Sequence, residues 1–141
     1  MGTAILVAED NAVSRELLML QLGLLGFEAE AFDNGADAAV AWRSRRYAML
    51  LTDLQMPGLD GYELASLIRG EERDERMPIV ALTAGNGGAD TERDAAHRAA
   101  CGMDACIFKP PSLAALRDVV GCWAGAATSQ TPPAPVPTPR P

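Results

Sequence analysis

Positive charge is scarce in this sequence of 141 residues, where 12 Lys and Arg face 19 Asp and Glu and the formal net charge is −7. Nucleic acids require a basic surface that neutralises their phosphates, so this balance argues against a nucleic acid partner. It also argues against an anionic membrane surface as a partner. The sequence contains neither an apolar run long enough to span a bilayer nor a cleavable signal pattern at its start.

Cysteine is equally rare, with only Cys101, Cys106 and Cys122. No C-x-x-C pair is present, which argues against a structural zinc site, and the odd number favours a reducing compartment over a disulfide scaffold. We expect all three cysteines to be small buried apolar residues. The glycine-rich stretch 86–88 lacks the lysine and following Ser or Thr of a P-loop, so it predicts a mobile loop without phosphate-binding function.

Apolar residues, by contrast, make up 48% of the sequence, which is enough for the core of one domain. Five short apolar runs predict β-strands at residues 3–8, 27–32, 47–52, 78–82 and 105–108. Helical spacing predicts helices between them at residues 13–25, 36–46, 90–100 and 112–123, with a further helix that opens at the N-cap Asp60. In the second and last helices we expect these side chains to face inward: Ala39, Val40, Trp42, Leu113, Leu116, Val119 and Val120.

The continuous apolar strands indicate that both faces of the sheet are covered, which is typical of parallel strands. Right-handed crossovers then give an α/β doubly wound sandwich of three layers, with five strands and five helices. We expect this domain to span residues 1–123. Residues 124–141 are rich in proline and have no apolar periodicity, so we expect an extended, disordered linker or tail there.

Polar residues follow four of the five apolar strands at the point where each strand ends. Glu9 and Asp10 follow the first strand and Asp53 follows the third. Thr83 and Lys109 follow the fourth and the fifth. Because the carboxyl ends of parallel strands share one edge of the sheet, we expect these five side chains to converge on one cleft. A single aspartate after a strand is more often a turn or cap residue, but five polar residues at the same edge of the sheet favour a functional site.

Three carboxylates gathered in one cleft repel one another and need a cation. An all-oxygen site suits Mg²⁺ or Mn²⁺, which keep several waters and take one or two carboxylates. Asp10 and Asp53 are expected to be direct ligands, and Glu9 is expected to act through a water molecule. The main-chain carbonyl of Gln55 is expected to supply a further oxygen.

A carboxylate beside a divalent cation and an ammonium group is suited to attack phosphorus. We expect Asp53 to be the nucleophile and to form an aspartyl phosphate, because the metal and Lys109 neutralise the phosphoryl oxygens. The hydroxyl of Thr83 is placed to hydrogen-bond one of these oxygens. A phosphohistidine is the best donor, because its neutral leaving group needs little help.

Four stretches resemble those of response regulator receiver domains, namely residues 7–11 (VAEDN), 51–61 (LTDLQMPGLDG), 82–84 (LTA) and 108–110 (FKP). The resemblance extends over residues 4–123. It implies a flavodoxin-like and CheY-like sheet with strand order 2-1-3-4-5, dependence on Mg²⁺, and phosphorylation at Asp53. It also implies a phosphoryl-stabilising role for Ala84 and a cis peptide bond before Pro110.

Within this family, the stretch 102–104 (GMD) ahead of 108–110 (FKP) is most similar to receivers of hybrid sensor histidine kinases of the virulence-sensor type. The implied partners are a histidine kinase, a histidine-phosphotransfer domain, or both, and the implied location is the cytoplasm. The resemblance also implies that the domain catalyses phosphoryl transfer to its own aspartate and slow dephosphorylation. A stand-alone response regulator is the alternative.

Receivers usually carry Tyr or Phe three residues before the conserved lysine, and here that position is Cys106. The substitution argues against a switch made by an aromatic rotamer and leaves open a pseudo-receiver that only binds proteins. A haloacid-dehalogenase-like phosphatase would need a second Asp where Gln55 stands. A flavodoxin-like FMN binder would need a Ser/Thr-rich loop after the first strand. The only histidine, His97, is expected on the surface and away from the cleft.

Overall fold

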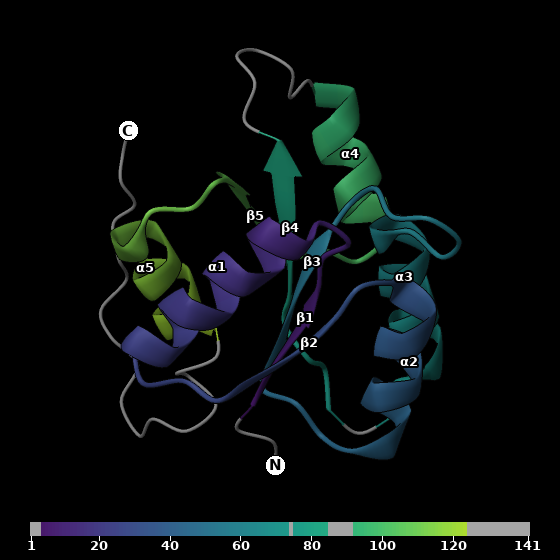
Figure 1. Ribbon diagram of the computed structural model, residues 1–141. Coiled ribbons are helices and arrows are strands. Elements are labelled where there is room, and N and C mark those ends of the chain that lie inside the picture. Colours follow the sequence, from purple (N-terminus) through teal and green to yellow (C-terminus); the bar gives the residue numbers. More distant parts are fainter. Residues whose placement is uncertain (1–3, 74, 85–91, 124–141) are drawn as a thin grey trace.

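A parallel sheet of five strands forms the middle layer of the computed structural model, which describes residues 4–73, 75–84 and 92–123 (Figure 1). The strands are β1 (Ile5–Ala8), β2 (Ala29–Phe32), β3 (Met49–Asp53), β4 (Ile79–Ala84) and β5 (Ala105–Lys109). The helices are α1 (Ala12–Leu24), α2 (Gly35–Ser44), α3 (Gly61–Glu71), α4 (Glu92–Ala100) and α5 (Leu113–Trp123). The strand order is β2-β1-β3-β4-β5, with every neighbouring pair parallel. The predicted fold class and strand order are therefore confirmed.

The helices cover both faces of the sheet. Figure 1 shows α1 and α5 on one face and α2, α3 and α4 on the other. Among the described residues, no helix combines the length and the hydrophobicity that a membrane crossing requires. The proline-rich segment 124–141, predicted as a linker, and the glycine-rich stretch 86–88 lie outside the described residues.

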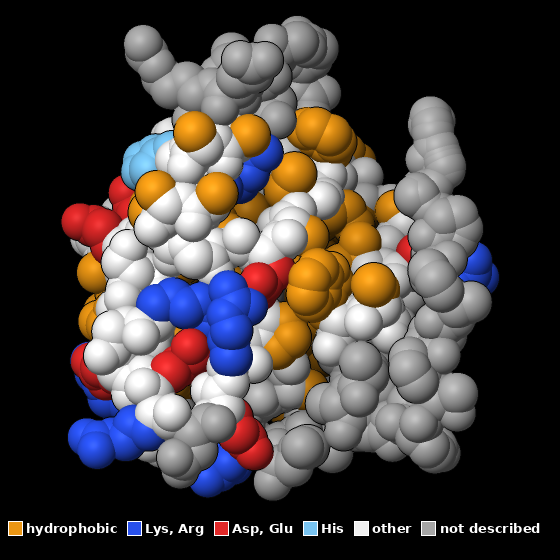
Figure 2. Space-filling view, turned by 180° about the vertical axis from the view of Figure 1, so that it is seen from behind, with side chains coloured by type: hydrophobic (Ala, Val, Ile, Leu, Met, Phe, Trp, Pro, Cys, Tyr) orange, Lys and Arg blue, Asp and Glu red, His pale blue; other side chains and the backbone are white. Residues whose placement is uncertain are grey.

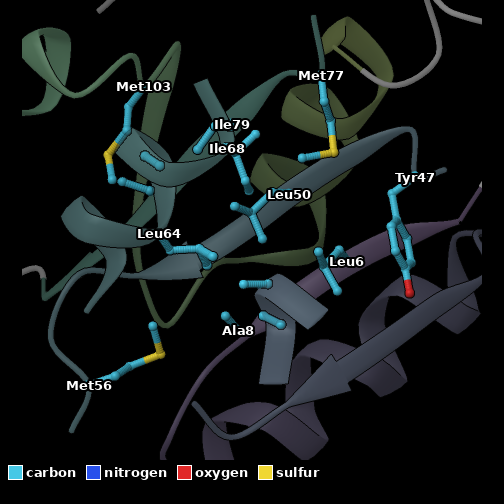
Figure 3. Packing of buried hydrophobic residues seen from close by; sticks show 14 of the residues in the cluster. Leu6, Ala8, Tyr47, Leu50, Met56, Leu64, Ile68, Met77, Ile79 and Met103 are labelled. Carbon is cyan, nitrogen blue, oxygen red and sulfur yellow. The ribbon is translucent and has the colours of Figure 1, made fainter. Parts of the chain in front are cut away.

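Two hydrophobic clusters lie on the two faces of the sheet, and each strand contributes to both. In β1, Leu6 belongs to the cluster on the α2 and α3 side, whereas Val7 belongs to the cluster on the α1 and α5 side. This alternation follows from the two-residue repeat of a strand and explains why β1, β3 and β4 carry apolar side chains on both faces of the sheet. In Figure 3, Leu50 of β3 lies among the side chains of the first cluster, together with Leu64 and Ile68 of α3.

Side-chain caps define where several of the helices begin, among them α1 and α3. The Asn11 side chain accepts a hydrogen bond from the backbone N–H of Ser14 at the start of α1. At the start of α3, Asp60 and Glu63 form a reciprocal capping box, with both hydrogen bonds at 2.9 Å. The prediction that Asp60 is a helix cap is confirmed, and the cap satisfies N–H groups that the helix itself leaves without partners.

Several expectations about burial are wrong. Val40 of α2 is 58% exposed and Leu113 of α5 is 41% exposed, although both were expected to face inward. Ala39 of α2 is buried as expected and Ala38 is buried beside it, whereas the next position along the helix turns away by about 100°. All three cysteines were expected to be buried, but Cys122 is exposed and Cys101 and Cys106 are only half-buried. Helical periodicity alone does not decide which of two apolar arcs meets the sheet.

The described surface includes apolar side chains near the edge strand β5. Within the described part of the chain the strand pairs only with β4, and Phe108 near its end is exposed. Figure 2, which views the molecule from behind, shows hydrophobic side chains gathered in the middle of this face and a group of Lys, Arg, Asp and Glu side chains beside them. His97 is exposed, as expected, and its ring stacks on Tyr62 of α3 with 3.7 Å between the ring centroids.

Candidate functional site

The three predicted carboxylates meet at the carboxyl edge of the sheet. Glu9 and Asp10 directly follow β1, and Asp53 is the last residue of β3. One carboxylate oxygen from each of the three lies within 4.8 Å of the others, so the group could hold a metal ion. The donors are all hard oxygens, which fits Mg²⁺ or Mn²⁺ and not a metal that prefers thiolate or imidazole.

The three acids differ in burial. Glu9 is fully buried, Asp53 is 9% exposed and Asp10 is exposed. The cluster therefore opens to solvent on the side of Asp10, while Glu9 forms its floor. Buried carboxylates are costly unless a cation or hydrogen-bond donors compensate them.

Lys109 supplies part of that compensation. Its Nζ lies 3.0 Å from Glu9 Oε1 and 3.4 Å from Asp53 Oδ2. Glu9 also accepts a hydrogen bond of 3.1 Å from the backbone N–H of Asn11. The sequence predicted the contact between Lys109 and Asp53 but missed Glu9 as the nearer partner. The available signal was the pair of adjacent acids after β1, of which Glu9 is fully buried and Asp10 is exposed.

The charges of the site perturb the pKa values of Asp53 and Lys109. Burial and the neighbouring Glu9 carboxylate raise the pKa of Asp53, while Lys109 opposes the shift. Burial alone would lower the pKa of Lys109, but its hydrogen bonds to Glu9 and Asp53 and their charges raise it overall. Three carboxylates and one ammonium leave two formal negative charges in the cluster. A divalent cation would balance them, so the residues present fit the metal that the resemblance implies.

Thr83 lies beside this cluster. Leu82 of β4 is the register partner of Asp53, so Thr83 stands one position closer to the carboxyl edge of the sheet. Thr83 lies within β4, and Asp53 and Lys109 are the last residues of β3 and β5, whereas all three were predicted to follow their strands. The Oγ1 atom of Thr83 is buried and has no hydrogen-bond partner among the described residues. A buried hydroxyl without a partner is costly unless something arrives to bond it.

The other predicted site residues are placed as follows. Ala84 is the register partner of Lys109, so the two lie side by side in the sheet. The backbone nitrogen of Gln55 lies 3.5 Å from Asp53 Oδ1, and the role of its carbonyl as a metal ligand stays a prediction. Cys106 is half-buried and packs against the cluster on the α3 side. The peptide bond between Lys109 and Pro110 is cis.

Gly61 fixes the distance between α3 and the end of β3. A Cβ atom at this position would lie 2.1 Å from the backbone oxygen of Asp53, which is far below van der Waals contact. The backbone N–H of Gly61 donates to the Leu54 carbonyl at 3.0 Å. The glycine thus lets the first turn of α3 pack directly on the backbone of Asp53, a role that the sequence analysis did not recognise.

Gly61→Ala is expected to lower the free energy of unfolding by about 1–3 kcal/mol, because either α3 or the end of β3 must shift. The shift should also weaken Mg²⁺ binding, because Asp53 moves. Urea denaturation and a Mg²⁺ titration measure the two effects. Gly70→Ala is the matched control, since nothing lies within 4 Å of a Cβ there in the same helix. The control should be neutral or stabilising by up to about 1 kcal/mol, and equal effects of the two substitutions would contradict the prediction.

Comparison with known protein families identifies residues 5–121 with the response regulator receiver domain. Among curated proteins, the chain is 36% identical over 114 residues to the sensor protein EvgS of Escherichia coli K12, covering 81% of this chain and 9% of EvgS. It is 36% identical over 132 residues to the virulence sensor protein BvgS of Bordetella bronchiseptica, covering 93% of this chain and 11% of BvgS. The chain thus spans about a tenth of the length of the curated relatives it matches.

The solved structures that are similar to this chain include two receiver domains from signalling proteins. The receiver domain of the sensor histidine kinase PA1611 from Pseudomonas aeruginosa, with a magnesium ion coordinated in its active site cleft, is 33% identical with a TM-score of 0.76. The match covers 89% of this chain and 99% of that one. The receiver domain of Ssk1 from Saccharomyces cerevisiae, crystallised with the histidine phosphotransfer protein Ypd1, is 27% identical with a TM-score of 0.79 over 92% of this chain and 93% of that one.

Proposed function

Because the chain belongs to the response regulator receiver domain family, we propose that Asp53 accepts a phosphoryl group from a phosphohistidine as one step of a phosphorelay. The observation that carries the proposal is the arrangement around Asp53. Its carboxylate lies within 4.8 Å of oxygens from Glu9 and Asp10 and 3.4 Å from the Lys109 ammonium. This combination places a nucleophile between a potential cation site and a fixed positive charge.

Mg²⁺ is the proposed cofactor, with Mn²⁺ as an equivalent in the test tube. Asp10 and Asp53 would be direct ligands, Glu9 would act through water, and the Gln55 carbonyl would complete the oxygen set. The magnesium ion in the cleft of the PA1611 receiver supports this assignment. When bound, the metal would neutralise charge on the phosphoryl oxygens.

The protein's own groups account for the remaining steps. An Asp53 carboxylate oxygen forms a bond to phosphorus while the bond from phosphorus to the donor histidine nitrogen breaks. That nitrogen keeps the electron pair and leaves as neutral imidazole, provided that the other ring nitrogen carries a proton. Lys109 pairs with a phosphoryl oxygen, and the Thr83 hydroxyl donates to another, which would give its buried Oγ1 a partner.

The parent protein is proposed to be a hybrid sensor histidine kinase, because the matched proteins include several sensor proteins and sensor histidine kinases. The donor would then be a histidine kinase or a histidine-phosphotransfer domain, and the domain would lie in the cytoplasm. The crystallised pair of Ssk1 receiver and Ypd1 supports a partner of the phosphotransfer type. A stand-alone response regulator would use the same site with the same chemistry.

Incubation with acetyl phosphate tests the chemistry directly. With Mg²⁺ present, the intact mass should increase by one phosphoryl group, and borohydride trapping followed by peptide mapping should place that group on Asp53. Chelation of the metal by EDTA should abolish the gain. Labelling that persists in EDTA, or that maps to another residue, would contradict the proposal.

A strip of apolar side chains on α1 supports docking of a protein partner. Val13, Leu17, Leu20 and Leu24 recur at helical spacing and are all exposed, Val13 by 76% and Leu24 by 68%. The strip begins two residues after the Asn11 cap, close in sequence to Asp10, and so runs away from the site along the outer face of α1. A protein that carries a phosphohistidine would bury this strip while it presents its phosphoryl group to Asp53.

The double substitution Leu20→Ser and Leu24→Ser is expected to slow phosphoryl transfer from a cognate phosphohistidine protein by about tenfold or more, since buried apolar anchors contribute upward of about 1 kcal/mol each. Labelling by acetyl phosphate should stay unchanged, because the small donor needs no docking surface. Val40→Ser, an equally exposed site on the opposite layer, serves as the control. A parallel loss with both donors would rule out a docking role.

A further inference from the structure

Two consecutive prolines follow the lysine of the site. Pro110 and Pro111 have no backbone N–H, so their carbonyls are the only main-chain groups through which hydrogen bonds can anchor them. The strand before them, β5, lies at the edge of the sheet, and among the described strands it pairs with β4 alone. Lys109 is held on one side by its pairing with Ala84, and its placement depends also on whatever holds the segment that follows it.

Gln21 of α1 holds this segment from 90 positions away in the sequence. Its Nε2 donates a hydrogen bond of 2.8 Å to the carbonyl oxygen of Pro111. The contact crosses from a helix of the outer layer to the connection between β5 and α5. Pro111 itself is buried, and Gln21 is only 8% exposed, so water does not easily replace the bond.

Packing alone does not explain a glutamine at this position. The Pro111 carbonyl can only accept, so the amide must turn its NH₂ group toward it. Oε1 is then left buried, and it has no hydrogen-bond partner among the described residues. Gln21 is flanked in the helix by the buried Leu18 and Leu22, and an apolar side chain there would leave no such oxygen.

We propose that Gln21 is a positioning residue for Lys109. By holding the Pro111 carbonyl, it keeps the Lys109 ammonium at 3.0 Å from Glu9 and 3.4 Å from Asp53. The expected effect of Gln21 on phosphoryl transfer rests on the proposed function. Its effect on the position of the Lys109 ammonium does not. Gln21 also lies on the helix that carries Leu17 and Leu24, so one helix bears both the proposed docking strip and the support of the lysine.

Gln21→Met tests the proposal, because methionine keeps the length of the side chain and removes the amide. The phosphorylation rate with acetyl phosphate at saturating Mg²⁺ should fall at least fivefold, while the affinity for Mg²⁺ should not weaken, since Lys109 is not a metal ligand and its ammonium repels the cation. The Lys109 ¹³Cε and ¹⁵Nζ signals should move toward those of a free lysine. Gln21→Glu, which replaces the donor by an acceptor, should produce the same pattern.

Leu22→Val is the matched control. Leu22 is the fully buried neighbour of Gln21 on α1, and its side chain has no group that could hydrogen-bond the Pro111 carbonyl. This substitution should lower stability but leave the rate and the Lys109 signals near those of the unsubstituted protein. A wild-type rate with unmoved Lys109 signals in Gln21→Met, or an equal loss of rate in Leu22→Val, would overturn the proposal. If the unsubstituted protein takes up no phosphoryl group, the proposed function fails, and the Lys109 signals alone still decide the role of Gln21.

Discussion

Asp53→Asn is expected to abolish Mg²⁺-dependent phosphorylation and, at the same time, to raise the free energy of unfolding at neutral pH. The amide cannot act as the nucleophile, so no aspartyl phosphate forms. The gain in stability follows from the site's electrostatics. Burial and the Glu9 carboxylate make ionised Asp53 less favourable in the folded chain than in the unfolded one, and this is why its pKa is raised.

The sign of the stability change depends on pH. Because the folded-state pKa of Asp53 is raised, its favourable contribution is complete below the ordinary aspartate pKa of 3.8 and is lost as the pH rises through the folded-state value. At pH 7 the carboxylate is therefore destabilising, and its neutral replacement by Asn removes the penalty. Near pH 3 the advantage of Asn over Asp should disappear.

Urea denaturation of both proteins at pH 7 and near pH 3 measures this difference, and a titration with Mg²⁺ completes the comparison. The metal should stabilise the wild-type protein more than the Asn variant, because it binds the folded state through Asp53. Asp60→Asn is a suitable control, since Asn caps helices about as well as Asp and Asp60 lies outside the acidic cluster. A variant that is less stable than wild type at pH 7 would contradict the electrostatic account.

Arg69→Met is expected to lower the free energy of unfolding by about 3–5 kcal/mol, since it breaks a largely buried ion-pair network. Arg69 is half-buried on α3 and donates to the Gly102 carbonyl at 2.9 Å and to the Met77 carbonyl at 2.9 Å. It also pairs with Glu72 at 2.8 Å and with Asp104 at 3.0 Å, and the side chains of both acids are at most 12% exposed. One guanidinium thus joins α3, the start of β4 and the turn before β5.

The loss should appear as a fall in Tm of roughly 10–20 °C in a thermal scan and as a lower urea midpoint. Arg43→Met is the matched control, because Arg43 makes a similar contact of 2.8 Å with Glu71, but the two side chains are 46% and 42% exposed. An exposed pair of this kind contributes at most about 1 kcal/mol. If the two substitutions lower the free energy of unfolding equally, the contribution of the Arg69 network does not come from its burial.

The same network gives a physical meaning to the Gly102-Met103-Asp104 stretch. Gly102 has a φ of +89°, and a Cβ there would lie 2.6 Å from the Arg69 side chain. Met103 is buried in the cluster on the α3 side, and Asp104 pairs with Arg69. In the sequence these three residues contributed only to a family resemblance, because Arg69 lies more than 30 positions away.

The sequence by itself determined the kind of fold and the edge that carries the site. Apolar runs with helical segments between them require a covered parallel sheet, and polar residues at the ends of β1 and β3 must then share one edge. The grouping of Glu9, Asp10 and Asp53 followed from that periodicity, because strand direction alone fixes where the ends lie.

Only the tertiary structure decided which side chains touch across elements. It placed Glu9 nearer than Asp53 to Lys109, turned the apolar strip of α1 outward, and joined Gln21 to Pro111. Periodicity repeats within one element and says which residues share a face. The contacts between faces depend on how helices dock on the sheet and which rotamers fill the gap, and those are settled only when all layers pack together.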